Sequence, residues 1–370
     1  MRSDEDRISP SEGGLAPLLV NGESIPLVDK YVYLGVEINK DLDFKTMAKY
    51  RITKGQGTLA CVRNTLCNNR VPLEYKPMLI RSVLIPRLTF GAEIFGMSKP
   101  RTQAMKAILD NSIKCVLGSS KFCRLRAYEE LSIEPLHIST SVARTRAFRK
   151  WFDSRSLIRD LLVSMGEFKC KKRTWTTQTK VWLKYLRIDL ELETRELIHE
   201  VRLNRMVAWR AQDRSVIGSR AVDLSLGSGR QIRFTEIHGV LPHRGIIALT
   251  RIRTGTFRFA DYYARIGAIE PIYREQCFCC RAIVREDAWH LLMECTAFST
   301  TRAQFPFGRG LTVVRDGRGF VLGLATLLGG EQVASQNKLP RETVDVIVYL
   351  SLVIPRRSAF LAGCLGPARV

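Results

Sequence analysis

The stretch CFCCRAIVREDAWHLLMEC, residues 277–295, decides how the C-terminal part of this chain is expected to fold. Its cysteines and histidine follow the spacing C-x2-C, nine residues, and then H-x4-C. Zinc prefers four thiolate or imidazole ligands in a tetrahedron, and a C-x2-C turn presents two sulfur atoms to one ion. We therefore predict a structural Zn²⁺ site, which also stabilises a unit too small to fold well alone. The predicted ligands are Cys277, Cys280, His290 and Cys295, the last two presented by a helical segment over residues 286–294.

Cys279 leaves the ligand set open, because its thiol could replace that of Cys277 or Cys280. A set of buried free thiols around a core histidine is the alternative without metal. A redox C-x-x-C is disfavoured because no thioredoxin-like βαβ pattern surrounds it. The chain has 10 cysteines, and its polar N-terminus lacks the apolar segment of a signal peptide. We therefore predict reduced or metal-bound thiols in a nuclear or cytoplasmic protein, not a secreted one.

The charge of the chain predicts a polyanionic partner. Lys and Arg number 58 against 36 Asp and Glu, which gives a formal net charge of +22 over 370 residues. This excess cannot be buried, so the surface attracts RNA or DNA, and contacts to backbone phosphates supply most of the affinity. A basic protein without a specific partner is the alternative. No membrane partner is expected, since the apolar run over residues 344–354 is too short to span a bilayer.

Lys and Arg outnumber Asp and Glu across residues 101–175, a stretch that ends in a basic cluster beside Trp175. A solvated face is the alternative explanation of such a run. We predict that its side chains bind phosphates, so that binding tolerates many sequences and weakens steeply as salt rises. The predicted phosphate contacts are Lys121, Arg124, Arg126, Arg146, Arg149, Lys150, Lys169, Lys171, Lys172 and Arg173.

Hydrophobic periodicity predicts most of the chain to be helical. The clearest predicted helices cover residues 44–66, 75–95, 101–117 and 138–165. In the last of these, Arg144 and Arg155 interrupt an apolar stripe, and we expect both to extend past it toward solvent. Near the N-terminus, Asn21-Gly22 predicts a hairpin turn. Residues 31–36 predict a strand in which Gly35 forms a bulge or a close backbone approach.

Several motifs resemble those of LINE-type (non-LTR retrotransposon) reverse transcriptases. YVYLGV at residues 31–36 resembles the YLGV segment after the family's palm, and PRLTFG at 86–91 resembles its thumb-region P-x-L-x-Y-G stretch. LTRIRTG at 249–255 resembles the L-x-x-x-R-T-G stretch that precedes the family's C-terminal zinc knuckle. The four predicted zinc ligands match that knuckle, as do the following Phe298 and Arg302. Each motif is short, and their shared order along the chain carries the resemblance.

The resemblance covers about residues 20–305 and lacks the catalytic parts of the family. Reverse transcriptases hold two Mg²⁺ ions with paired aspartates in a Tyr/Phe-x-Asp-Asp turn and one upstream Asp, and no Asp-Asp pair occurs in this chain. After Cys295 it also lacks the Pro-Asp and carboxylate cluster of the nuclease that some relatives carry. The resemblance therefore implies a C-terminal remnant without fingers or palm, which is not an enzyme on its own.

The expected fold is mainly α-helical, with a small N-terminal β element, a helical thumb-like domain and then a small zinc-binding domain. The resemblance implies that the thumb helices grip a template–primer duplex along its backbone and that the zinc domain contacts RNA or target DNA. The expected boundaries are 1–14 for a disordered tail, 15–40 for the β element at the palm/thumb junction, 41–213 for the basic thumb-like domain, 214–243 for a linker, 244–305 for the zinc-binding (CCHC) domain and 306–370 for a C-terminal tail with one helix.

Three other functions stay open. The chain could complete a polymerase when a missing fingers–palm half is its partner. It could be a zinc-dependent interaction module whose positive surface is incidental, in which case binding survives high salt. It could also be a decayed pseudogene product without a selected function. His238 and His243 flank a Gly and a Pro and could form a second metal site.

Overall fold

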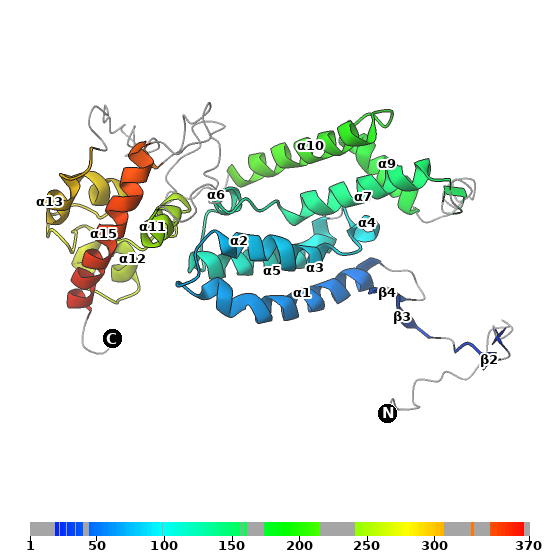
Figure 1. Ribbon diagram of the computed structural model, residues 1–370, viewed down its shortest axis with the longest axis horizontal. Coiled ribbons are helices and arrows are strands. Elements are labelled where there is room, and N and C mark those ends of the chain that lie inside the picture. Colours follow the sequence, from blue (N-terminus) through cyan, green and yellow to red (C-terminus); the bar gives the residue numbers. More distant parts are fainter. Residues whose placement is uncertain are drawn as a thin grey trace. The chain divides into compact units, whose positions relative to one another are not determined.

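The computed structural model describes residues 19–21, 23–26, 28–33, 35–39, 44–97, 99–155, 157, 159–160, 174–214, 241–306, 327–328 and 341–365. The described chain is mainly helical with a small N-terminal β element, which confirms the predicted fold class (Figure 1). It divides into two compact units. Unit 1 comprises Met1–Ala60, Leu84–Leu109 and Leu136–Arg205, and unit 2 comprises Cys61–Val83, Asp110–Pro135 and Met206–Val370.

The N-terminal β element consists of two hairpins. Strand β1 (Leu19–Val20) pairs antiparallel with β2 (Glu23–Ser24), and Asn21 has the left-handed φ of 53° that the predicted turn requires. Strand β3 (Lys30–Tyr33) pairs antiparallel with β4 (Val36–Asn39). The expectation of one strand through residues 31–36 was therefore wrong. Gly35 has a φ of 78°, which turns the chain between two strands and does not make a bulge within one.

Helices form most of the remaining described chain. Those up to residue 153 are α1 (Phe44–Cys67), α2 (Tyr75–Leu79), the π-helix η2 (Ile80–Leu84), α3 (Ile85–Thr89), α4 (Ala92–Phe95), α5 (Lys99–Leu117), α6 (Arg124–Glu130) and α7 (Leu136–Asp153). The predicted helices over 44–66 and 101–117 are confirmed by α1 and α5. The following elements are α9 (Trp175–Tyr185), α10 (Thr194–Arg214), α11 (His243–Arg253), α12 (Ala260–Arg265), η4 (Pro271–Arg274), η5 (His290–Glu294), η6 (Thr296–Phe298), α13 (Ser299–Arg302) and α15 (Arg341–Cys364).

Two predicted helices differ from the structure. The helix expected over 75–95 runs without a break from Tyr75 to Thr89, with a π turn just before Pro86, which has no N–H for the helical ladder. It ends at Phe90 and Gly91, where Gly91 takes a φ of 79°, and α4 follows as a separate short helix. The helix expected over 138–165 ends at Asp153, where the Ser154 hydroxyl donates to the carbonyl of Trp151 at 2.9 Å. Such a side chain competes with the next backbone hydrogen bond of a helix. Residues 161–165 lie outside the described residues.

Unit 1 has a core formed by α7, α9 and α10. Val142, Phe148, Leu183, Leu197 and Val201 are buried together, and burial of such side chains stabilises the packing by roughly 1.5–3 kcal/mol each. Helix α4 also lies against α7 (Figure 1). These contacts fix the orientation of α9, whose outer side is exposed.

Arg144 is the largest fully buried side chain of unit 1, so the expectation that it extends to solvent was wrong. Its Nη1 donates to the carbonyls of Ile94 (2.9 Å) and Gly96 (3.2 Å), and its Nη2 donates to that of Trp175 (3.0 Å). Its Nε donates to the Thr179 hydroxyl at 3.0 Å. Burial lowers the pKa of Arg144 to about 10. The guanidinium therefore satisfies carbonyls at the end of α4, where helices leave them unpaired. Arg155 is exposed, as expected.

Unit 2 is built around the contact between α11 and α15, which lie side by side in Figure 1. Ile246 and Leu249 of α11 are buried, as are Val346, Ile347 and Leu350 of α15. By length and composition α15 could cross a membrane, and it is longer than the apolar run over residues 344–354 suggested. Its buried face nevertheless packs within unit 2, as in the core helix of a folded domain.

The close approach of α11 and α15 depends on Gly245. A Cβ added there would lie 1.9 Å from the carbonyl oxygen of Ile347. We expect Gly245→Ala to destabilise the protein by about 1–3 kcal/mol, since the two helices must separate. The matched control is Gly57→Ala in α1, where a Cβ meets nothing within 4 Å. That variant should gain about 0.5–1 kcal/mol from the higher helix propensity of alanine. Urea unfolding measures both, and equal stability of the two variants would contradict the close approach.

Candidate metal centre and nucleic-acid interface

The C-x2-C segment forms a closed turn. The backbone N–H of Cys277 donates to the carbonyl of Ala282 at 3.0 Å, and that of Arg281 donates to the carbonyl of Cys277 at 2.9 Å. Arg281 adopts a left-handed φ of 62°. This conformation is unusual for a residue with a Cβ, and the two hydrogen bonds hold it in place. The turn places Cys277 and Cys280 on the same cluster.

A π turn explains the H-x4-C spacing. Residues five apart lie about 140° around an α-helix from each other, so an α-helix would separate the two ligands. In η5 the N–H of Cys295 instead donates to the carbonyl of His290 at 2.8 Å, five residues earlier. The i→i+5 hydrogen bond of a π turn brings both residues to one side.

The helical segment expected from Glu286 begins later than predicted. Glu286 and Asp287 are not helical. The Asp287 carboxylate accepts from the backbone N–H of His290 at 2.7 Å, which is the role of a helix N-cap. Glu286 forms a buried ion pair with Arg357 of α15. Both carboxylates are thus occupied outside the helix, and they fix the point where it starts.

The four predicted ligands are brought together. One sulfur or nitrogen atom from each of Cys277, Cys280, His290 and Cys295 lies within 4.8 Å of all the others, and all but half-buried Cys280 are buried. The Cys280 Sγ to His290 Nε2 distance is 3.4 Å. Bonds of about 2.0–2.3 Å in a tetrahedral zinc site place ligand atoms roughly 3.4–3.8 Å apart. The cluster therefore has a composition and a size that suit one zinc ion.

Cys279 belongs to a different arrangement. It lies in a group with Cys277 and Glu286. Both carboxylate oxygens of Glu286 are held by Arg357 at 2.7 Å, and one also accepts from the N–H of Ala260 at 2.7 Å. That carboxylate is already satisfied, and the group contains no histidine. The geometry favours Cys277 and Cys280 as the ligands.

Hydrogen bonds link the thiols and the imidazole of the cluster. Hydrogen bonds from the Cys279 and Cys295 thiols hold the pKa of Cys277 far below its usual value. The same bonds to Cys277 raise the pKa of Cys279 and Cys295. A hydrogen bond to Cys277 raises the pKa of His290 to about 9. Only deprotonated thiols and imidazoles ligate zinc, so an ion held by these residues would take the place of the shared protons.

Glu294 supports the histidine ligand from outside the cluster. Its carboxylate accepts from His290 Nδ1 at 3.3 Å and from the Trp289 indole N–H at 2.8 Å. A carboxylate on the outer nitrogen of a metal-binding imidazole fixes its tautomer and orients its other nitrogen. His290 Nε2 is accordingly the atom directed at Cys280. Sequence reasoning did not identify Glu294, although its position four residues after His290 on a helical segment was a usable signal.

No family model matches this chain, and neither does any curated protein or any solved structure. The resemblance to LINE-type reverse transcriptases therefore rests on the quoted motifs and remains a prediction. Within the motif at residues 249–255, Arg253 forms a buried ion pair with Glu130, and Gly255 adopts a positive φ of 69°. These two roles are structural in unit 2. Arg251 of the same motif is only partly buried.

The predicted phosphate-binding residues fall into three groups. Lys121, Arg146 and Lys150 are exposed. Three others are engaged in the protein, as Arg124 pairs with Asp110 (3.3 Å), Arg126 pairs with Glu129 (3.6 Å), and Arg149 donates to the Leu192 carbonyl (2.6 Å). Lys169, Lys171, Lys172 and Arg173 lie outside the described residues, as does His238 of the suggested second metal site. The three exposed side chains can direct all their N–H donors at phosphates, whereas the three engaged arginines already use some of theirs within the protein.

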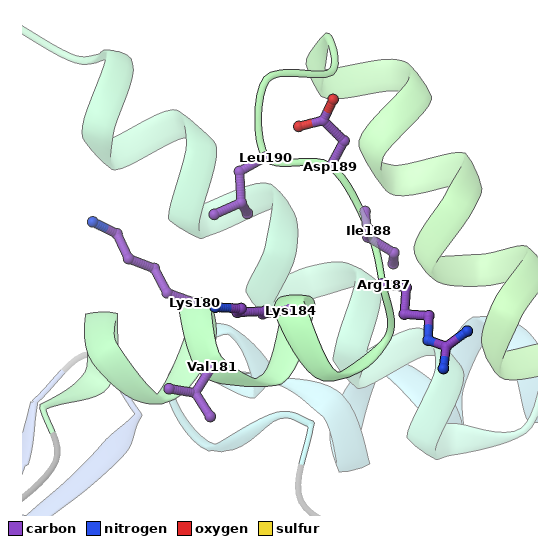
Figure 2. A pocket seen from close by; sticks show the side chains of 7 residues that line it. All are labelled: Lys180, Val181, Lys184, Arg187, Ile188, Asp189 and Leu190. Atoms are coloured by element: carbon purple, nitrogen blue, oxygen red, sulfur yellow. The ribbon is translucent and has the colours of Figure 1, made fainter.

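The structure adds a basic surface that sequence reasoning missed. Lys180 and Lys184 of α9, with Arg187 just after it, surround a shallow hollow of about 530 Å³ (Figure 2). Asp189, the one acidic side chain among the described residues that line it, accepts from the backbone N–H of Glu191 at 2.9 Å. Tyr185 follows Lys184 in the chain and is 83% exposed, outside the residues that line the hollow. An exposed aromatic ring near a basic surface is typical of proteins that bind single-stranded nucleic acid. The K-x3-K-x2-R spacing was the available signal.

Proposed function

We propose that this chain is a nucleic-acid-binding protein whose unit 2 is held together by a structural Zn²⁺ ion. We further propose that it corresponds to the C-terminal remnant of a LINE-type reverse transcriptase and has no polymerase activity on its own. The single observation that carries the proposal is the meeting of Cys277, Cys280, His290 and Cys295 within 4.8 Å in a chain of net charge +22. Four protein ligands complete a tetrahedron, so the ion has no open position for catalysis.

Binding in this proposal is electrostatic and directed at the phosphate backbone. Lys121, Arg146 and Lys150 are exposed, and the hollow beside α9 adds Lys180 and Lys184. Cations that contact phosphates release condensed counterions, so the logarithm of affinity falls linearly with the logarithm of salt concentration. Such contacts position a strand without reading its bases. The proposal therefore implies similar affinity for unrelated sequences.

The test neutralises the basic stretch that immediately precedes α9. Replacing Lys171, Lys172 and Arg173 with glutamine should lower affinity for all sequences alike and reduce the salt slope by roughly two to three units, about 0.7–0.9 per lost contact. Fluorescence anisotropy with several RNA and DNA strands measures both quantities. The matched control exchanges the same positions for the other basic residue, Lys171→Arg, Lys172→Arg and Arg173→Lys, and should bind like the wild type. A loss confined to one sequence contradicts the assignment.

A fingers–palm half as a separate partner is the second candidate, and strand β3 favours it. Tyr31, Val32 and Tyr33 are exposed by 63%, 45% and 58%, whereas the turn and the second strand of the hairpin are held by Arg51, which donates to the Gly35 carbonyl, and by the Asn39–Thr46 hydrogen bond. Apolar residues gathered on an exposed strand are typical of a surface that pairs with another chain. Primer extension tests this candidate with the chain alone and with such a half added. Activity only in the mixture supports it, and inactivity of both together with no binding to the half excludes it.

A further inference from the structure

A cavity in unit 2 is independent of the metal centre. Its volume is about 810 Å³, within the range of roughly 300–1,000 Å³ that is typical of small-molecule sites. Three separate segments line it: the loop after α1, helix α11 and the middle of α15. One wall is apolar and includes Ile247, Phe257 and Ile354. Arginines supply the positively charged part of the lining.

The charge of this cavity is uncompensated. Arg70, Arg244 and Arg251 line it, and no Asp or Glu is among its lining residues in the described chain. Arg70 and Arg244 are exposed, and neither guanidinium has an ion pair with any residue that the structure describes. Toward the described residues, Arg251 donates its Nε alone, to the carbonyl of Leu117 at 3.2 Å. Three guanidinium groups around one apolar cavity favour an anionic ligand.

Neighbouring cations increase this preference. Burial lowers the pKa of Arg251, and the charge of Arg258 lowers it further. Burial likewise lowers the pKa of Lys76, and the charge of Arg251 adds to that effect. The positive charge around Arg251 therefore extends beyond the residues that line the cavity, and a positive potential attracts anions.

The cavity wall is held in place before any ligand arrives. The His243 Nε2 donates to the carbonyl of Asn69 at 3.0 Å, which ties the first turn of α11 to the loop that carries Arg70. The Arg258 Nη2 donates to the carbonyl of Gly118 at 3.0 Å, beside the Leu117 carbonyl that holds Arg251. Preorganised donors lose less entropy on binding than mobile ones. The Nη groups of Arg251 form no hydrogen bond with the residues that the structure describes.

We propose that this cavity binds one nucleotide, with its phosphate on Arg70, Arg244 and Arg251 and its base against Ile247 and Phe257. A guanidinium donates two parallel hydrogen bonds to a phosphate, and an apolar wall suits a nucleobase removed from its stack. The inference rests on the proposed function and names the place where one unstacked nucleotide of a bound strand is held. It also gives Arg251 of the motif at residues 249–255 a role beyond packing.

The test measures ligand binding to the full chain by calorimetry at low salt. The probes are uridine 5′-monophosphate, uridine, inorganic phosphate and a short oligouridine strand. The variant is Arg70→Ala with Arg244→Ala, because both side chains are exposed and the fold should tolerate their loss. The matched control is Arg274→Ala, an exposed arginine of unit 2 that does not line the cavity. Melting temperatures of all proteins report whether the fold is intact.

We expect the double variant to bind uridine 5′-monophosphate about tenfold or more weakly than the wild type, and Arg274→Ala to bind it like the wild type. The nucleotide should bind more tightly than uridine or phosphate, and oligouridine should displace it. Equal affinity of the folded double variant and the wild type overturns the inference, as does phosphate binding as tightly as the nucleotide. Failure of oligouridine to displace the nucleotide overturns the assignment to a bound strand. If oligouridine binds in a salt-dependent way but the nucleotide does not bind, only the proposed nucleotide site in the cavity is contradicted. If no nucleic acid binds at all, the proposed function is contradicted as well.

Discussion

Cys295→Ser is expected to abolish zinc binding and to destabilise unit 2 by more than about 5 kcal/mol, since structural zinc contributes roughly 10–16 kcal/mol in small zinc domains. Cys295 is buried, and its carbonyl accepts from Arg302 Nη2 at 3.1 Å. The preceding η5 is tied to α15 by the Tyr349 hydroxyl, which donates to the Leu291 carbonyl at 3.0 Å. Loss of the ion therefore removes the link between the C-x2-C turn and the π turn, and it loosens the packing of α15.

The matched control for this prediction is Cys279→Ser. Cys279 is also buried but lies outside the four-ligand cluster. It should retain zinc and unfold near the wild-type temperature. Thermal unfolding followed by near-UV circular dichroism, with and without a chelator, compares the two variants. A Cys295→Ser protein as stable as the wild type, together with no effect of the chelator, would show that no metal holds this unit.

Arg357→Ala is expected to destabilise unit 2 by about 3–5 kcal/mol, because it leaves the Glu286 carboxylate buried without its cation. Arg357 donates Nε and Nη2 to the two oxygens of Glu286, each at 2.7 Å, and Nη2 also donates to the Arg258 carbonyl at 2.9 Å. Its guanidinium carbon lies 5.1 Å from the ring centre of Phe257 and 4.9 Å from that of Phe278. It therefore joins α15 to the residue beside the Cys277 ligand.

The neighbouring Arg356 provides the matched control. It is exposed and donates to the Thr301 hydroxyl at 2.9 Å, so Arg356→Ala should lose less than about 1 kcal/mol. Adding Glu286→Gln to Arg357→Ala should recover part of the lost stability, since the unpaired charge is then gone. Urea unfolding of the three variants tests this order. If Arg357→Ala and Arg356→Ala lose the same stability, the buried pair does not hold α15.

Helical periodicity in the sequence predicted long helices correctly, as α1 and α5 show. The apolar positions of both helices recur over many residues. Neither helix contains a residue with a left-handed φ, and Pro100, in the first turn of α5, is the only proline in either helix. The errors arose where tertiary contacts prevail. Arg144 interrupts an apolar stripe, and only the fold shows that three carbonyls and a hydroxyl receive it. Gly35 has the same freedom in a bulge and in a turn, so the residue alone could not distinguish them.

The metal cluster was predictable because its ligands lie within one short stretch, where spacing limits which atoms can meet. The residues that support the cluster from outside, and those that line the cavity, come from distant parts of the sequence. Glu286 and Arg357 are 71 residues apart, and the cavity combines segments from residues 69–70, 242–257 and 351–354. Contacts at such separations depend on how helices pack, which a single sequence does not specify. The π turn could have been inferred, since an H-x4-C pair meets more readily in that turn than in an α-helix.

Zinc content per chain, measured after purification without added metal, tests the central claim most directly. The wild type and Cys279→Ser should each carry about one zinc ion, and Cys280→Ser combined with His290→Ala should carry none. That result supports a zinc-held unit 2 and the ligand set that the geometry favours. Absence of zinc from the folded wild type would contradict the account and leave a basic helical protein with a cluster of free thiols.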